Sequence, residues 1–234
     1  MPKVYDCIQG SPTWSRIRAG LPTSSCFDKI VTAGGKPSKQ AERYMMGLLA
    51  ERLMGHPIVE VMSFWMERGS EMELRAVRWY EFQRDTETTP VGFITTDDGR
   101  IGASPDRLVA GDGLLEVKAP SEPVHMSYLL QTGSCYDEYR VQVQSQLWVT
   151  GRAWTDLLSW HGELPPALVR IERDEKFIAI LEPLVLEFSD KLERLAKELE
   201  SMELGGYRAE REKSLTELLK ESLIELKAGG ANGH

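Results

Sequence analysis

Apolar side chains recur three and four positions apart through much of the first ninety residues, which is the spacing of one face of a helix. This pattern predicts helices over residues 40–54 and 63–82, and Gly55 is expected to end the first of them. A cluster of hydroxyl residues before an apolar run predicts a shorter, capped helix over 23–31. The residues before it show no clear period, so we expect an irregular start followed by these helices.

The pattern changes near residue 90, where short β-prone runs replace the helical spacing. These runs predict strands over residues 91–94, 100–103 and 114–118. Asp-Gly and Gly-Asp-Gly sequences separate them and supply tight turns. We therefore expect the three strands to form a meander.

The second half of the chain alternates between helical and strand-like patterns. Residues 136–149 have helical spacing, 154–160 and 167–172 are strand-like, and 174–203 form a long amphipathic pattern. Helices, strands, helix, strands and helix in this order predict an α+β fold, close to α/β. In such a fold, helices flank a mixed central β-sheet.

The composition is that of a globular domain, because 41% of the residues are hydrophobic and can supply a core. We expect residues 1–203 to form one domain, followed over 204–234 by a helical extension with a flexible Gly-rich end. The sequence shows neither a leader-like start nor an apolar run of membrane-spanning length. Cys7, Cys26 and Cys135 lack the spacing of a disulfide framework or a metal cluster. A cytoplasmic protein without a membrane partner is expected.

The net charge of -8 argues against a protein that coats nucleic acid by bulk positive charge, because phosphate neutralisation needs lysine and arginine at the contact. A nuclease remains compatible with this charge, since a divalent metal site needs carboxylates that no neighbouring cation neutralises. The sequence contains no phosphate-binding Gly-rich loop, so no nucleotide cofactor is expected.

The strongest chemical pattern is Glu116-Val117-Lys118 inside an apolar run, ten residues after Asp106. In a strand, Glu116 and Lys118 project from one face, and Asp106 at the end of a neighbouring strand would add a second carboxylate. Two carboxylates can hold a divalent cation, and a lysine can orient or deprotonate water, as metal-assisted phosphodiester hydrolysis requires. Taken singly, the motifs are more simply a turn and a strand with an ion pair, but their joint order favours the site.

Other polar residues extend this candidate site. Glu73, on the helix before the strands, offers a third carboxylate, unless it is a solvated surface residue. Gln142, Gln144 and Gln146 recur in a predicted helix, on which Gln142 and Gln146 share a face. These amides either position a water, a lysine or a phosphate, or bond within the core.

Arg18 precedes the hydroxyl-rich helix start that contains Thr23 and Ser25. A guanidinium fork and free helix N–H groups together suit a phosphate. Ordinary helix capping beside a surface arginine is the alternative interpretation.

With these residues in place, the chain resembles the lambda exonuclease family of phage-type recombination nucleases. These are YqaJ-like proteins with a restriction-endonuclease-like PD-(D/E)XK fold. The matching stretches are collinear and extend from residue 14 to about 203. They are Trp14–Ser25, Gly69–Glu73, Ala103–Asp106, Leu115–Pro120, Gln142–Gln144 with Leu147–Thr150, and Ile171–Phe177.

The resemblance implies a catalytic role for each matching site residue. Mg²⁺ would be bound, as two ions per site and with Mn²⁺ as an alternative, by Asp106, Glu116, Glu73 and the backbone carbonyl of Val117. Lys118 would act on the attacking water, and Gln144 would support the site.

The resemblance also implies a set of DNA contacts. The terminal 5′-phosphate would be held by Arg18, Thr23, Ser25 and Ser104. Met66 would be an apolar wedge that parts the end of the duplex. Arg107 stands where family members commonly have glycine, and it is a candidate DNA contact. The loop expected over 121–125 lacks the basic residue of lambda exonuclease.

The family's activity implies a Mg²⁺-dependent 5′-to-3′ exonuclease of bacterial or phage origin. It would degrade one strand of double-stranded DNA from its end, release 5′-mononucleotides, and leave 3′ single strands for recombination by annealing. A ring-shaped homotrimer and a single-strand annealing recombinase are the implied partners. Two alternatives remain: a structure-specific or restriction-type endonuclease with the same core, and a non-catalytic DNA-end-binding protein.

Overall fold

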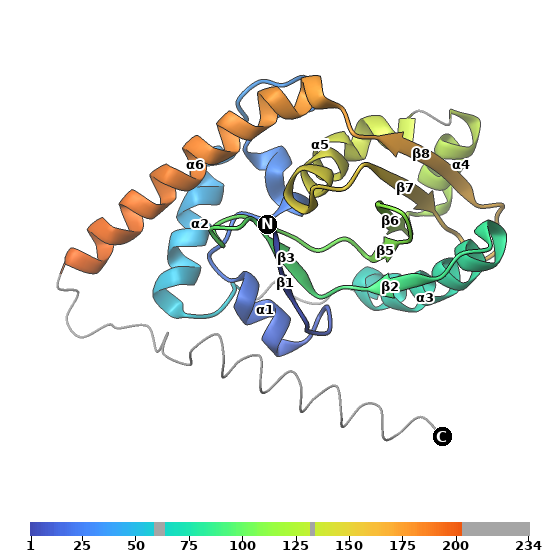
Figure 1. Cartoon of the computed structure of the whole chain (residues 1–234), viewed down its shortest axis with the longest axis horizontal. Helices are drawn as coiled ribbons and strands as arrows, with labels where there is room; N and C mark the ends of the chain where they lie inside the picture. The colour runs from blue at the N-terminus through green and yellow to red at the C-terminus, as the bar shows by residue number, and fades with distance from the viewer. Residues whose placement is uncertain (59–63, 132–133, 203–234) are drawn as a thin grey trace.

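The computed structural model describes residues 1–58, 64–131 and 134–202, with the side chains of 64–71 and 134 left out (Figure 1). The helices are α1 (Pro12–Arg18), the 3₁₀ helix η1 (Ser24–Lys29), α2 (Ala41–Met54), α3 (Phe64–Arg84), α4 (Glu122–Leu130), α5 (Ser134–Thr150) and α6 (Glu175–Ser201). The strands are β1 (Lys3–Tyr5), β2 (Thr88–Pro90), β3 (Phe93–Thr95), β4 (Gly102–Ala103), β5 (Arg107–Val109), β6 (Gly113–Lys118), β7 (Trp154–Ser159) and β8 (Ala167–Glu172).

A five-stranded mixed sheet forms the centre of the fold, in the order β2-β5-β6-β7-β8. Strands β6 and β7 are parallel and pair Lys118 with Ser159, while the other neighbours are antiparallel. The two parallel strands are joined by a crossover that contains α4 and α5. The mixed sheet flanked by helices that the sequence predicts is confirmed.

Adjacent leucines on β6 show how the sheet separates two helical layers. Leu114 packs with Val143 and Leu147 of α5, whereas Leu115 packs with Ala76 and Tyr80 of α3. Because successive strand residues point to opposite faces, β6 is buried on both sides. Figure 1 shows α5 and α3 on either side of this sheet.

The expected meander over residues 91–118 is wrong. Strands β3 and β4 pair with β1 in a separate three-stranded sheet, while β6 belongs to the central sheet. The chain leaves β4 through Ser104 and Pro105, and proline cannot donate to a continuing ladder. It then forms β5, which the pattern did not predict and which is the partner of β6.

The other differences concern short elements. The irregular start contains β1 and α1, and the expected loop over 121–125 is the first turn of α4, which has proline early in the helix. The capped helix over 23–31 is a 3₁₀ helix in which Thr23 makes no capping bond with its side chain. Such segments are too brief for an apolar period to be visible.

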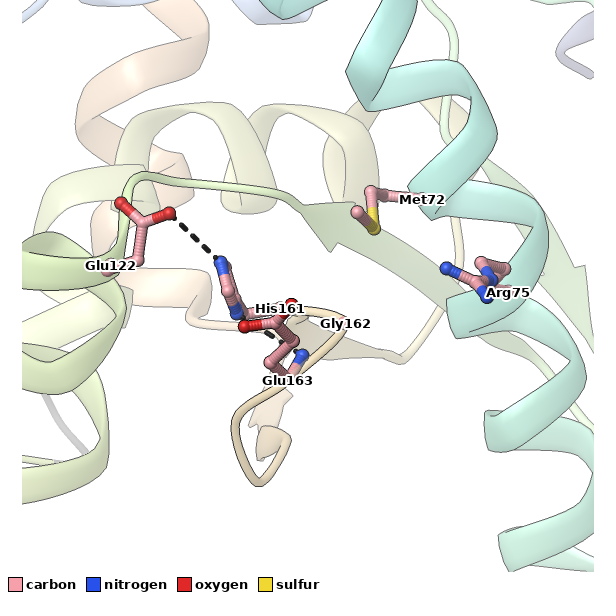
Figure 2. Close-up of a pocket in the computed structure, with 6 residues that line it drawn as sticks. All are labelled: Met72, Arg75, Glu122, His161, Gly162 and Glu163. Carbon is pink, nitrogen blue, oxygen red and sulfur yellow. Dashed lines mark hydrogen bonds and ion pairs between the residues drawn. The ribbon is translucent and has the colours of Figure 1, made fainter.

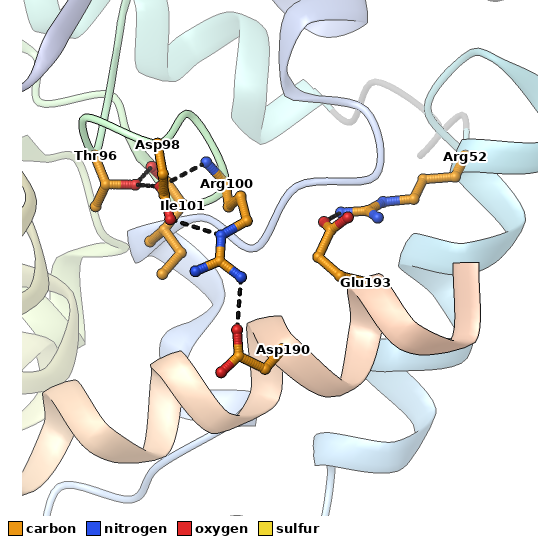
Figure 3. Close-up of polar contacts among 7 residues, drawn as sticks. All are labelled: Arg52, Thr96, Asp98, Arg100, Ile101, Asp190 and Glu193. Carbon is orange, nitrogen blue, oxygen red and sulfur yellow. Dashed lines mark hydrogen bonds and ion pairs between the residues drawn. The ribbon is translucent and has the colours of Figure 1, made fainter. Parts of the chain in front are cut away.

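Helix α6 matches the predicted amphipathic segment closely. Asp174 caps it by accepting a hydrogen bond from the Phe177 N–H at 3.0 Å. Its buried face packs with α2. Two ion pairs join the second half of α6 to other segments, Glu193 with Arg52 of α2 and Asp190 with Arg100, both at 2.6 Å (Figure 3). The C-terminal helix expected after residue 203 lies outside the described residues. Within the described ranges, no helix is both long and apolar enough to cross a membrane.

Candidate active site

Asp106, Glu116 and Lys118 meet at the C-terminal part of β6. The antiparallel pairing of Arg107 with Leu115 brings Asp106, the residue before β5, opposite Glu116. The Val117 N–H donates to Asp106 Oδ2 at 2.6 Å, and Lys118 Nζ donates to Glu116 Oε1 at 2.7 Å. The strand geometry therefore places two carboxylates and one ammonium together, as the sequence pattern predicts.

Glu116 is only 3% exposed, and amide groups from α5 surround its carboxylate. Gln142 Nε2 donates to Oε1 at 2.6 Å, and Gln146 Nε2 donates to Oε2 at 2.8 Å. Together with Lys118, these donors satisfy both oxygens of a buried charge, which would otherwise be costly. The carboxylate is held in one orientation.

Gln144 does not take the role expected for it in this structure. Its Nε2 donates to the Glu172 carbonyl at 3.0 Å, and its Oε1 accepts from the Asp174 N–H at 2.8 Å. On a helix, residue 144 lies on a different face from 142 and 146, so it joins α5 to the end of β8. The sequence predicts that Gln142 and Gln146 share a helix face. It does not predict that this face meets the carboxylate of Glu116.

Lys118 is a charged group in this setting. Its Nζ also donates to Gln142 Oε1 at 3.0 Å and lies 4.5 Å from the centroid of the Tyr139 ring. Burial by itself would lower the pKa of Lys118, but the charge and hydrogen bond of Glu116 and the charge of Asp106 outweigh it and raise the pKa. The ammonium can therefore orient a water or stabilise negative charge while it stays protonated.

Glu73 reaches the site from α3 and faces Arg107. The distance from Arg107 Nη2 to Glu73 Oε1 is 3.6 Å. Burial raises the pKa of Glu73; the charge of Arg107 opposes this shift, and that of Glu116 adds to it. The third carboxylate is thus close to the other two, with a cation beside it.

The donor types at this site suit Mg²⁺. Burial and the charges of Glu116 and Glu73 raise the pKa of Asp106 well above its usual value, as expected where carboxylates converge without enough cations. Among the described residues, no group of three or more His, Cys, Asp and Glu side chains is arranged to hold a metal ion. However, Mg²⁺ commonly uses one or two carboxylates together with water and phosphate oxygens. Asp106, Glu116 and the Val117 carbonyl offer such a set.

A second cluster, formed by Arg18, Thr23, Ser25 and Ser104, surrounds Trp14, for which the sequence predicts no role. The Arg18 guanidinium lies 3.9 Å from the centroid of the Trp14 ring, and its Nη2 is 3.4 Å from Thr23 Oγ1 and 3.5 Å from Ser25 Oγ. Trp14 Nε1 donates to Ser104 Oγ at 3.0 Å. The four residues expected to hold a phosphate are therefore brought together, and among the described residues none of Arg18's hydrogen-bond partners is a carboxylate.

The two clusters are joined by the segment Ser104–Asp106. Gln9 Nε2 donates to the carbonyl oxygens of Pro105 and Val91, both at 2.8 Å. This side chain fixes the segment between the hydroxyl of Ser104 and the carboxylate of Asp106. No sequence motif marked Gln9, because its partners are backbone atoms more than eighty residues away.

An open pocket of about 360 Å³ is lined by residues of α3, of the start of α4 and of the loop after β7 (Figure 2): Met72, Arg75, Glu122, His161, Gly162 and Glu163. On one side of this pocket His161 Nε2 lies 3.2 Å from Glu122 Oε1. The neighbouring Trp160 N–H donates to the Lys118 carbonyl at 2.8 Å. The wedge proposed at Met66 belongs to α3, but its side chain lies outside the described part of the chain.

Residues 13–153 match the model of the YqaJ-like viral recombinase domain. The fold resembles an alkaline exonuclease (LHK-Exo) from Laribacter hongkongensis, with 32% identity, a TM-score of 0.73, and coverage of 81% of this chain and 96% of that one. The same exonuclease in complex with dAMP matches with 34% identity, the same TM-score and the same coverage.

A phage-related exonuclease from Haemophilus somnus shares the fold with a TM-score of 0.58 and 16% identity, over 76% of this chain and 96% of that one. None of the curated proteins compared with the chain matches it. The family that the sequence motifs indicated is confirmed: this chain belongs to the YqaJ-like viral recombinase domain family.

Proposed function

We propose that the chain is a metal-dependent 5′-to-3′ exonuclease that degrades one strand of double-stranded DNA from its end. The observation that carries this proposal is that one short segment joins the carboxylates to the Arg18 cluster. Ser104 accepts a hydrogen bond from Trp14, whose ring lies under Arg18, and Asp106 lies two residues later. The alkaline exonuclease similar to this chain supports the reaction class. A restriction-endonuclease-like core is part of the same proposal.

Asp106, Glu116 and the Val117 carbonyl would hold Mg²⁺, with Mn²⁺ as an alternative, and Glu73 would complete the set for a second ion. When bound, such ions lower the pKa of a water and stabilise the leaving oxygen. Gln142 and Gln146, in place of Gln144, keep Glu116 oriented. Lys118 contributes its charge to the attacking water or to the phosphate.

Arg18, Thr23, Ser25 and Ser104 would bind the terminal 5′-phosphate. A guanidinium bonded only weakly to hydroxyl groups keeps donors free for an anion, and charge-assisted bonds to phosphate are strong. With the terminal phosphate held there, a phosphodiester of the same strand can lie against Asp106 and Glu116. Cleavage would then proceed from a 5′ end and release mononucleotides.

Two further parts of the proposal concern assembly. A homotrimeric ring would keep the duplex in place without the strong phosphate binding that a net charge of -8 makes unfavourable. The remaining 3′ strand would pass to a single-strand annealing recombinase.

The test is digestion of linear and circular duplex DNA, labelled on either strand, with MgCl₂ or with EDTA. We expect loss of 5′ label as mononucleotides from linear DNA in Mg²⁺ only, and intact circles. Cut circles would favour an endonuclease instead. Binding of ends without cleavage by the wild-type protein would favour the non-catalytic alternative.

A further inference from the structure

Arg107 has a partner that the sequence did not predict. Its Nη2 lies 3.6 Å from Glu73 Oε1, and its Nη1 lies 3.4 Å from the carbonyl oxygen of Asp106. At these distances the first contact is an ion pair without a good hydrogen bond, and the second is weak. The guanidinium is therefore held near Glu73 mainly by charge.

The charges of the site explain why a cation lies there. Asp106 and Glu116 lie together at the C-terminal part of β6, and Glu73 faces Arg107, the residue that follows Asp106, so a partly buried cluster of negative charge must be balanced. Lys118 balances Glu116 through a bond of 2.7 Å. Arg107, with a side chain that is 16% exposed, is the cation that faces Glu73.

This pairing also bears on the metal site. Among the described residues, the acidic side chains do not form a group of three that could hold a metal ion. Glu73 forms an ion pair with an arginine, whereas Asp106 accepts a hydrogen bond from β6 and Glu116 accepts one from α5. A metal that takes Oε1 of Glu73 as a ligand would therefore displace Arg107 from it.

We propose that Arg107 is a displaceable counter-ion of Glu73, which balances that carboxylate in the metal-free protein and competes with a divalent cation for it. This inference rests on the proposed function, because it takes Asp106 and Glu116 as the cation's other ligands. Two positive charges repel each other strongly in a partly buried site, so Arg107 weakens cation binding. Once released, the guanidinium can pair with a DNA phosphate, which it matches with a planar fork of donors.

The experiment is calorimetric titration of MgCl₂, and separately of MnCl₂, into the full-length protein without DNA. Arg107→Gln removes the charge and should tighten cation binding by about threefold to tenfold. Arg107→Lys keeps the charge and should bind like the wild type. Arg78→Gln, an exposed residue of the same helix as Glu73, makes the same change in net charge and should leave the affinity unchanged. Equal or weaker binding by Arg107→Gln overturns the proposal.

Two further variants separate this proposal from the function on which it rests. In a Glu73→Gln background, Arg107→Gln should change the affinity less, because competition for Glu73 is absent and only the repulsion between Arg107 and the cation remains. Asp106→Asn should abolish cation binding altogether. If the wild type binds no cation, both proposals fail; if Asp106→Asn abolishes binding but Arg107→Gln changes nothing, only the role of Arg107 fails. Arg107→Met repeats the charge removal if a thermal melt shows that Arg107→Gln is unfolded.

Discussion

Gln146 donates a hydrogen bond from Nε2 to Oε2 of Glu116 at 2.8 Å, and both side chains are buried. Gln142, one turn earlier on α5, holds the other carboxylate oxygen. Gln144 between them bonds backbone atoms at the end of β8 and the start of α6. Helix α5 thus uses Gln142 and Gln146 to hold Glu116, and Gln144 to join β8 and α6.

The first prediction concerns the different roles of Gln146 and Gln144. Gln146→Leu leaves one oxygen of Glu116 without its donor, so we expect metal affinity or exonuclease rate to fall about 10- to 100-fold, as is typical when the support of a metal ligand is lost. Gln144→Leu should lower the free energy of unfolding and have a smaller effect on the rate. Steady-state kinetics and urea unfolding of both variants would separate the two effects; a larger rate loss for Gln144→Leu would contradict the assignment.

The second prediction concerns Asp106. Asp106→Asn removes a carboxylate whose pKa is raised by burial and by its acidic neighbours, and cleavage in MgCl₂ should be abolished. Binding of a duplex end, measured by fluorescence anisotropy, should persist because the Arg18 cluster is intact. Because the amide introduced by Asp106→Asn would not be repelled by the charges of Glu116 and Glu73, the variant should also stay folded or become more stable. Cleavage at the wild-type rate would exclude Asp106 from the chemistry.

The third prediction concerns the phosphate cluster. Arg18→Ala should remove any preference for 5′-phosphorylated over 5′-hydroxyl ends, since a hydrogen bond to a charged group contributes about 1.5–3 kcal/mol, or roughly tenfold or more. Arg16→Ala is the matched control, because Arg16 is exposed on the same short helix. The measurement is the ratio of initial rates on the two ends. A preference that survives Arg18→Ala would place the phosphate elsewhere.

The fourth prediction concerns stability and pH. Hydrogen bonding from the Phe177 N–H lowers the pKa of Asp174 below its usual value, and Arg140 adds to this shift. A carboxyl whose pKa is depressed by folding stabilises the protein above its unfolded pKa, and this contribution is lost as the pH falls through the folded value. Asp174→Ala should therefore cost about 1 kcal/mol at neutral pH, the usual effect of losing a helix cap.

Urea unfolding at pH 7 and at successively lower pH values below 4 provides the check. The difference between Asp174→Ala and the wild type should shrink on acidification. Asp174→Asn keeps a capping side chain and should retain most of the stability at pH 7. A difference independent of pH would mean that the carboxylate charge plays no part.

The sequence by itself determined the features that depend on local period and on residue chemistry. The strand alternation of Glu116 and Lys118, the shared helix face of Gln142 and Gln146, and the amphipathic α6 all follow from repeat distances within one element. Motif order identified the family. These features are local, so no knowledge of distant neighbours was needed.

Only the tertiary structure decided which of these faces meet. It placed Gln142 and Gln146, in place of Gln144, on Glu116; it set Arg107 against Glu73; and it divided the expected meander between two sheets. Each outcome depends on how α3 and α5 pack on opposite faces of β6, a relation between segments tens of residues apart. Local period fixes the direction of a side chain within its element, but the partner it meets depends on long-range packing.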